Sequence, residues 1–209
     1  MTSEMTTKKT QVARLHRLMG MNLVKGFSLA IDGGANIGAW SIVMAEHFDK
    51  VIAFEPVPET FGLLVENVKA HQNVECHNLA LMDKAGIIKI KMPDYSDKHQ
   101  QATGEIINKD LRSRYVEWDN TGDIAATTVD SLNLASCDLI KLDLEGAEPL
   151  ALDGAIETIK KFRPVLVVEI KRHSKRFRVH PTLVHQKVLD MGYCESFRDG
   201  HDRFYVSDK

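Results

Sequence analysis

Three charged residues lie at the end of one short apolar segment of this chain, and their side chains are of types that can transfer protons. Lys141, Asp143 and Glu145 occupy alternate positions as the segment 139–142 ends. Because side chains of a strand alternate between its two faces, the three point the same way while the strand lasts. A carboxylate so placed can accept a proton or orient a hydroxyl group. The alternative for Lys141 is a structural salt bridge, because a buried charge is costly unless it is paired.

A second polar group follows the next apolar segment, residues 165–170. Glu169 lies at its end, and Lys171 and His173 come directly after it. These residues can complete a polar wall around an acceptor, with Glu169 in the catalytic group and Lys171 and His173 binding substrate. His99, in a long polar stretch, is a further candidate for substrate binding, with an ordinary surface histidine as the alternative.

A metal is one alternative use of the acidic residues. Asp143, Glu145 and Glu169 are hard oxygen ligands of the kind that magnesium prefers. Their spacing is not a metal signature, and carboxylates around a cationic cofactor explain them equally well. We therefore predict no metal.

A glycine-rich turn follows an apolar segment nearer the N-terminus. Residues 31–38 are Ile-Asp-Gly-Gly-Ala-Asn-Ile-Gly, and the next apolar segment ends at Glu55-Pro56. Glycine lets a backbone turn sharply and approach a ligand closely. An acidic residue at the end of the second strand can accept the two hydroxyls of a ribose. The alternatives are a helix cap for Asp32 and a solvated side chain for Glu55.

Two cofactors compete for this turn. A dinucleotide needs a second glycine where this chain has Ala35, whose Cβ would hinder a pyrophosphate. Asp32 would repel a diphosphate but suits an ammonium group. S-adenosylmethionine carries an ammonium, a sulfonium and a ribose but no phosphate, so the residues favour it.

The elements that must position these groups alternate between strand and helix. Helical patterns cover residues 10–24, 37–47, 61–68, 148–162 with a break at Gly154, and 181–191; strand patterns cover 27–31, 51–54, 74–77, 86–91, 139–142, 165–170, 193–197 and 203–206. Such alternation predicts a doubly wound α/β fold with a mostly parallel sheet. The short interval between the last two strands predicts a hairpin, hence one antiparallel strand. We expect an N-terminal helical extension over 1–25, a domain over 26–209, and a substrate flap over the irregular stretch 92–126.

Composition excludes several classes of protein. The 209 residues carry a net charge of −2, and no stretch approaches the roughly 20 apolar residues of a membrane span. The polar N-terminus lacks the apolar core of a signal peptide. Three scattered cysteines form no metal-ligand pattern, so the cytoplasm is the expected location.

One local patch departs from this balance. Residues 171–178 include five lysines and arginines in eight positions. A solvated loop is one interpretation, and contact with an anionic acceptor, either a phosphorylated sugar or a nucleic acid, is the other.

The ordered series of motifs resembles the FkbM family of S-adenosylmethionine-dependent methyltransferases. It comprises Asp-Gly-Gly-Ala-Asn-Ile-Gly from residue 32, Phe-Glu-Pro from 54, Asn67, Leu-Ala-Leu from 79, Thr-Val-Asp from 128, Asp-Leu-Ile-Lys-Leu-Asp-Leu-Glu-Gly from 138 and Gly154-Ala155. The resemblance implies a class I, Rossmann-like methyltransferase fold with seven strands, the last antiparallel, and methyl transfer to oxygen, often a hydroxyl of a sugar or natural product.

The resemblance also implies roles for individual residues. The turn that binds the methionine part of the cofactor would include Asp32, Gly33, Gly34, Ala35, Asn36 and Gly38. Glu55, followed by Pro56, would accept the ribose, and Asn78, Leu79 and Ala80 would edge the adenine pocket. Asp143 would face both cofactor and acceptor.

We therefore expect an O-methyltransferase that acts on a hydroxylated small-molecule or glycan acceptor. A methyltransferase of RNA or another nucleic acid that uses residues 171–178 is the alternative. A dinucleotide-dependent oxidoreductase and a domain that binds the cofactor without catalysis are further hypotheses. The sequence predicts no membrane partner and leaves the oligomeric state open.

Overall fold

The structure is a computed structural model that describes residues 23–91, 105–107, 121–171 and 181–208. The expected N-terminal helix falls almost entirely outside these ranges, as do most of the expected flap, His99 and His173.

The larger sheet has seven strands in the order β10-β11-β9-β8-β1-β2-β3. The strands are β1 (Leu29–Gly33), β2 (Lys50–Phe54), β3 (Val74–His77), β8 (Leu139–Leu142), β9 (Val165–Glu169), β10 (Tyr193–Asp199) and β11 (Asp202–Ser207). All neighbours are parallel except β11, which is antiparallel to both β9 and β10. This arrangement confirms the predicted fold class, including the antiparallel last strand.

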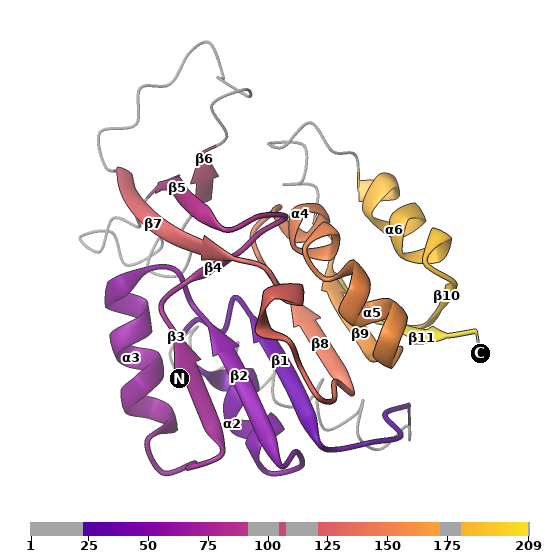
Figure 1. The fold of residues 1–209 in the computed structure, drawn as a ribbon, viewed down its shortest axis with the longest axis horizontal. Helices are drawn as coiled ribbons and strands as arrows, with labels where there is room; N and C mark the ends of the chain where they lie inside the picture. The colour runs from indigo at the N-terminus through magenta and orange to yellow at the C-terminus, as the bar shows by residue number, and fades with distance from the viewer. Residues whose placement is uncertain (1–22, 92–104, 108–120, 172–180, 209) are drawn as a thin grey trace.

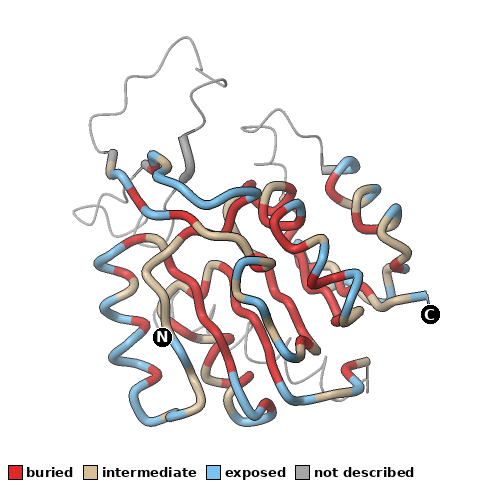
Figure 2. Tube along the Cα trace, in the orientation of Figure 1, coloured by how far each residue is buried: buried red, intermediate tan, exposed pale blue. Residues whose placement is uncertain are grey.

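Helices cover both faces of this sheet, which explains its apolar strands (Figure 1). α2 (Ala39–Ala45) and α3 (Pro58–Val68) pack on one face, whereas α4 (Glu148–Asp153), α5 (Ile156–Phe162) and α6 (Pro181–Asp190) pack on the other. Figure 2 shows the central strands buried along their length, while α3 alternates between buried and exposed positions.

The predicted break in the helix at Gly154 is confirmed. A Cβ at Gly154 would lie 2.0 Å from the carbonyl oxygen of Met82, so only glycine lets the two segments approach. The second half, α5, starts against a short 3-10 helix, η2 (Asp130–Leu132). There the carboxylate of Asp130 accepts hydrogen bonds from the backbone N–H groups of Glu157 and Thr158.

A second, four-stranded sheet lies across the carboxyl ends of β1, β2 and β3 (Figure 1). Its order is β4 (Ala80–Leu81), β7 (Thr121–Thr127), β5 (Gly86–Lys91) and β6 (Glu105–Ile107). The sequence predicts only β5 among these strands. Within the expected irregular stretch 92–126, residues 105–107 form β6 and residues 121–126 belong to β7, and both strands pair with β5. Ile124 and Ala126 are buried by this pairing, which a local pattern with few strand-forming residues does not reveal.

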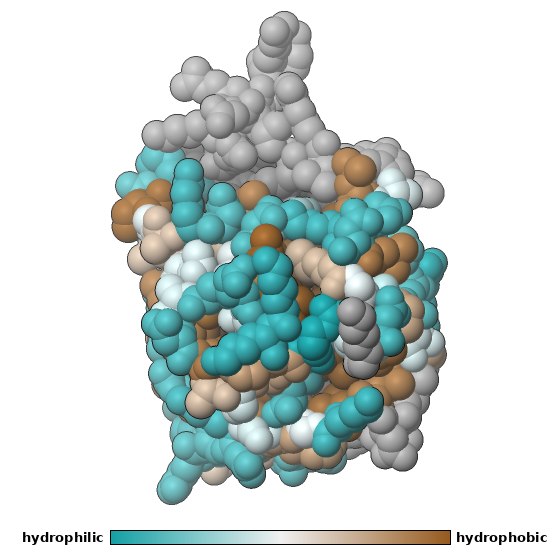
Figure 3. Space-filling model, turned by 45° about the vertical axis from the view of Figure 1, so that its right-hand side comes forward, coloured by the Kyte–Doolittle hydropathy of each residue, from teal (hydrophilic) through white to brown (hydrophobic). Residues whose placement is uncertain are grey.

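The surface of the described residues is mixed. Figure 3 shows one face on which hydrophilic residues separate small hydrophobic areas. Within the described ranges, no helix combines the length and apolar character that crossing a bilayer demands.

Candidate active site

The glycine-rich turn after β1 is held by backbone contacts to two other strands. The N–H groups of Gly34 and Ala35 donate to the carbonyl oxygen of Phe54 at 3.0 and 2.9 Å. Gly34 has φ of 70°, and a Cβ there would lie 1.9 Å from the carbonyl oxygen of Asp143. The glycine is thus required by the close approach of β1 to the segment after β8.

Other residues of the turn also have defined positions. Gly33 and Gly38 leave room for leucine side chains, and Gly38 has φ of 91°. Ala35 is buried in a cluster with Leu64 and Val68 of α3. Its methyl group therefore packs into the protein, which corrects the expectation that it would stand against a pyrophosphate.

Asp32 and Lys141 form a buried ion pair at the point where the strand order reverses. Lys141 Nζ lies 3.0 Å from Asp32 Oδ1, and the two side chains are 5% and 0% exposed. Lys141 also donates to the carbonyl oxygens of Gly33 and Gly34 at 3.3 and 2.9 Å, and Ser41 Oγ donates to Asp32 Oδ2. Burial alone would lower the pKa of Lys141, but the carboxylates, Asp32 first, outweigh it and hold the pKa above its ordinary value. Lys141 therefore stays charged and fixes the backbone of the turn through these hydrogen bonds. This geometry fits the structural salt bridge considered above, and direct catalysis by Lys141 stays a prediction.

Glu55 lies at the end of β2, beside the same turn. Its Oε2 accepts the N–H of Asn36 at 2.9 Å, and its Oε1 accepts the N–H of Val57 at 3.0 Å. Burial raises the pKa of Glu55 to about 7, although these two N–H groups pull in the opposite direction. Each carboxylate oxygen has a second lone pair, so both can still accept a hydroxyl group. A solvated side chain, the alternative for Glu55, does not describe it, because Glu55 is buried.

The segment after β3 is fastened to the end of β2. Asn78 Nδ2 donates to the carbonyl oxygens of Glu55 and Pro56 at 2.8 and 3.0 Å. Leu79 packs against the main core, and Ala80 is buried in β4. Asn78 therefore contacts the backbone at Glu55, and the adenine-pocket role of Asn78, Leu79 and Ala80 stays a prediction.

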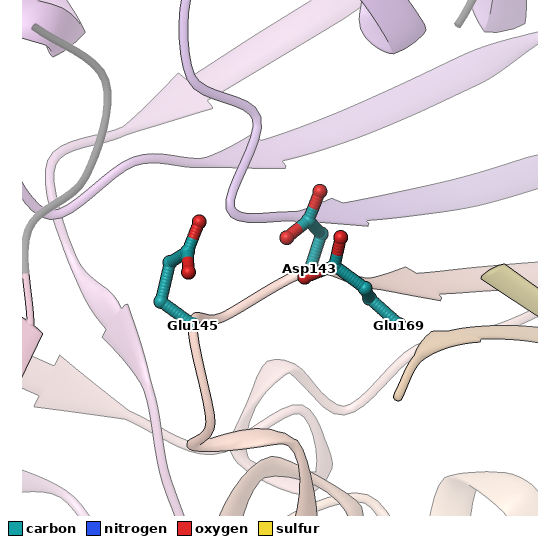
Figure 4. Close-up of side chains that lie close together, drawn as sticks. All are labelled: Asp143, Glu145 and Glu169. Carbon is teal, nitrogen blue, oxygen red and sulfur yellow. The ribbon is translucent and has the colours of Figure 1, made fainter. Parts of the chain in front are cut away.

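Three carboxylates meet where β8 and β9 end (Figure 4). Asp143, Glu145 and Glu169 each place one oxygen within 4.8 Å of the others. Glu145 adopts φ of 52°, a conformation uncommon for a residue other than glycine and often found at functional sites. The backbone N–H of Asp143 donates to the carbonyl oxygen of Gly33 at 3.1 Å, so the cluster adjoins the turn. The structure thus brings together the carboxylates that the sequence predicts for the acceptor side.

Glu169 and Lys171 are electrostatically coupled to this cluster. Burial raises the pKa of Glu169 to about 9, and the nearby charge of Asp143 adds to the rise. Lys171 Nζ lies 2.7 Å from Glu169 Oε2 and 3.4 Å from Glu145 Oε1. At neutral pH Glu169 therefore holds a proton more readily than an ordinary glutamate.

Sequence reasoning missed two acidic residues here. Glu148 Oε1 accepts the N–H groups of Leu144 and Gly146 at 2.8 and 3.1 Å, so it fixes the loop that carries Glu145. Burial raises its pKa to about 7. Asp202 is buried opposite Glu169 in the β9–β11 register. The pair Glu148-Pro149 at the start of a helix could have indicated a role for Glu148, whereas no local sequence pattern indicates one for Asp202.

Two predicted substrate-binding residues, His99 and His173, lie outside the described residues, as does the basic segment after Lys171. Lys171 itself is described, and it contacts the carboxylates of Glu145 and Glu169.

Comparison with known proteins gives a consistent result at the level of the sequence. A model described as "Methyltransferase FkbM domain" matches residues 32–194. "Methyltransferase 1" of Beauveria bassiana is 27% identical over 177 residues, covering 77% of this chain and 71% of that protein. "Methyltransferase sdnD" of Sordaria araneosa is 26% identical over 155 residues, covering 61% of this chain and 60% of its own length.

Solved structures share the fold. The methyltransferase FkbM from Methylobacillus flagellatus aligns with a TM-score of 0.54 at 18% identity, covering 86% of this chain but only 43% of its own length. A precorrin-6y C5,15-methyltransferase from Geobacter metallireducens aligns with a TM-score of 0.51 at 12% identity, covering 91% of this chain and 85% of its own. Some relatives are thus considerably longer than the matched region.

Proposed function

The chain belongs to the FkbM family of methyltransferases, and from this premise we propose that it transfers a methyl group from S-adenosylmethionine to a hydroxyl oxygen of a sugar-like or other small-molecule acceptor. The observation that carries this proposal is the pairing of two sites. Glu55 and the turn 33–38 lie at the ends of β1 and β2, and the carboxylate cluster adjoins them at the ends of β8 and β9. Parallel sheets bind ligands at such a reversal of strand order.

The residues around the turn fit the cofactor. Glu55 keeps acceptor capacity on both oxygens for the two hydroxyls of a ribose, and Asn78 fixes the adjoining backbone. When bound, S-adenosylmethionine supplies a methyl group already activated by a sulfonium. The protein then has to align the acceptor and remove its proton.

The acceptor side fits proton removal. Asp143 and Glu145 are partly exposed and close to the turn, so either can take the proton of a hydroxyl group. Glu169 is more buried and retains its proton near pH 7, which suits it to hydrogen bonding with the neighbouring carboxylate. We assign proton acceptance to Asp143 or Glu145 and orientation of the acceptor to the rest of the cluster.

Calorimetric titration with S-adenosylhomocysteine, with NADH in parallel, tests the cofactor assignment. We expect micromolar or tighter binding of S-adenosylhomocysteine alone. Glu55→Gln loses one carboxylate acceptor and should weaken this binding by at least about tenfold. Glu75→Gln, an exposed residue on β3 that pairs with Lys50, is the matched control and should bind as the wild type does. Binding of NADH instead, or of neither compound, would refute the assignment.

A screen with labelled methyl donor then tests the acceptor. Hydroxylated sugars and small molecules form one arm and RNA the other. Label on a small-molecule oxygen supports the proposal. Label on RNA that is lost as salt rises would replace it with the nucleic-acid alternative.

A further inference from the structure

Lys171 lies among the three carboxylates of the site. Its ammonium contacts Glu169 at 2.7 Å and Glu145 at 3.4 Å, and only 26% of its side chain is exposed. Burial alone would lower the pKa of Lys171, but the charges of Asp143, Glu169 and Glu145 outweigh it and raise the pKa above its ordinary value. The ammonium therefore stays charged inside the cluster.

The arrangement of the carboxylates demands a positive charge. Three carboxylate oxygens within 4.8 Å of one another would repel strongly if all three groups were ionised, and the charge of Asp143 adds to burial in raising the pKa of Glu169. Such a set of hard oxygens is also what a divalent cation binds. An ammonium and a metal ion would have to use the same oxygens, so the two exclude each other.

We propose that Lys171 is a positioning residue that acts as the built-in counter-ion of the carboxylate cluster, in the place that a divalent cation would otherwise take. The inference rests on the proposed function only for its catalytic consequence. Lys171 holds Glu145 and Glu169 in one geometry, so Asp143 and Glu145 meet the acceptor without a metal. Lys171 therefore belongs to the supporting structure of the site rather than to the recognition of an anionic acceptor.

Titration with Mn²⁺ tests the counter-ion role without any methyl transfer. Binding is measured by the decrease in the electron paramagnetic resonance signal of unbound Mn²⁺. Wild type should bind Mn²⁺ weakly, as an ordinary acidic surface does. Lys171→Met, which keeps the length of the side chain, should bind Mn²⁺ at least about tenfold more tightly. The added substitution Glu169→Gln should abolish this gain, and Lys171→Arg should restore weak binding. Lys160→Met, which removes an exposed lysine paired with Glu157, is the matched control and should show no gain.

Two results would overturn the proposal. One is a folded Lys171→Met protein, shown by circular dichroism, that binds Mn²⁺ no better than wild type. The other does not need the Lys171 variant and so covers the case in which that variant fails to fold: tight Mn²⁺ binding by the wild type that Glu169→Gln removes. Because neither result depends on the methyl donor, failure here is distinct from failure of the methyltransferase assignment, which the S-adenosylhomocysteine titration tests separately.

Discussion

At the residue scale, Asp32 and Lys141 show how a buried charge can serve a binding turn. Neither side chain has appreciable contact with water, so each needs the other. Lys141 adds hydrogen bonds to the carbonyl oxygens of Gly33 and Gly34, which fixes the backbone beside Glu55. The pair therefore acts on the site through the shape of the turn.

Removing the cation from this pair should be costly. Lys141→Met leaves the Asp32 carboxylate buried without a counter-charge, and we expect the free energy of unfolding to fall by about 3–5 kcal/mol. Urea unfolding followed by circular dichroism measures this. Lys160→Met breaks an exposed pair and should change stability by less than about 1 kcal/mol. An equal decrease in the free energy of unfolding in both variants would show that the buried pair contributes no more to stability than the exposed one.

The sequence predicts the convergence of Asp143, Glu145 and Glu169, because residues that end neighbouring parallel strands meet at one edge of the sheet. It does not predict which charges pair. Lys141 could have joined any nearby carboxylate, and only the three-dimensional register places it against Asp32. The position of Asp202 beside Glu169 could not be predicted for the same reason, because Asp202 belongs to a strand far along the chain.

At the scale of elements, the turn after β1 requires a residue without a side chain at position 34. A Cβ at Gly34 would collide with the carbonyl oxygen of Asp143, and its φ of 70° is unfavourable for other residues. The turn and the segment after β8 therefore have to be considered as one unit.

Two alanine substitutions separate this requirement from the general cost of glycine. Gly34→Ala should destabilise the protein by more than about 1 kcal/mol and weaken binding of S-adenosylhomocysteine. Gly62→Ala, in α3 with open space around it, should stabilise the protein by about 0.5–1 kcal/mol. Thermal unfolding of both variants measures the difference. Stabilisation in both would contradict the role given to Gly34.

The main sheet could be predicted because its central buried strands are continuous apolar segments, and residues 74–77 and 139–142 match the observed strands at both ends. In the second sheet only β5, residues 86–91, could be predicted. β4 has only two residues, and β7 contains glycine, aspartate and alanine. β7 pairs with both β4 and β5, and these partners are distant from it in sequence, which a local pattern does not encode.

At the scale of the whole molecule, three buried glutamates link stability to pH. The pKa of Glu55 and of Glu148 is raised to about 7 and that of Glu169 to about 9, in each case chiefly by burial. In the unfolded chain these glutamates have the ordinary pKa of 4.5, so they lose their protons at a lower pH than in the folded protein. Their contribution to stability is therefore complete below pH 4.5 and is lost as the pH rises through 7 and then 9.

We accordingly expect the free energy of unfolding to fall between pH 5 and pH 9 by at least about 1 kcal/mol. Glu169→Gln should flatten the upper part of this dependence, because it removes the group that titrates last. Urea titrations at several pH values give the curve, and Glu157→Gln, an exposed residue on α5, should leave it unchanged. A stability that rises over this range would contradict the assignment.

The antiparallel strand β11 has a consequence for how the protein is made. Glu169 lies beside Asp202, and the N–H of Ile170 donates to the carbonyl oxygen of His201. A ribosome therefore has to release the residues of β11 before the edge of β9 is covered and the acidic cluster has its final neighbours. Until then the nascent chain presents an open strand edge that can pair with another chain. A chain that lacks β11 would keep this edge open and would lack Asp202 beside Glu169, so we expect it to be prone to aggregation.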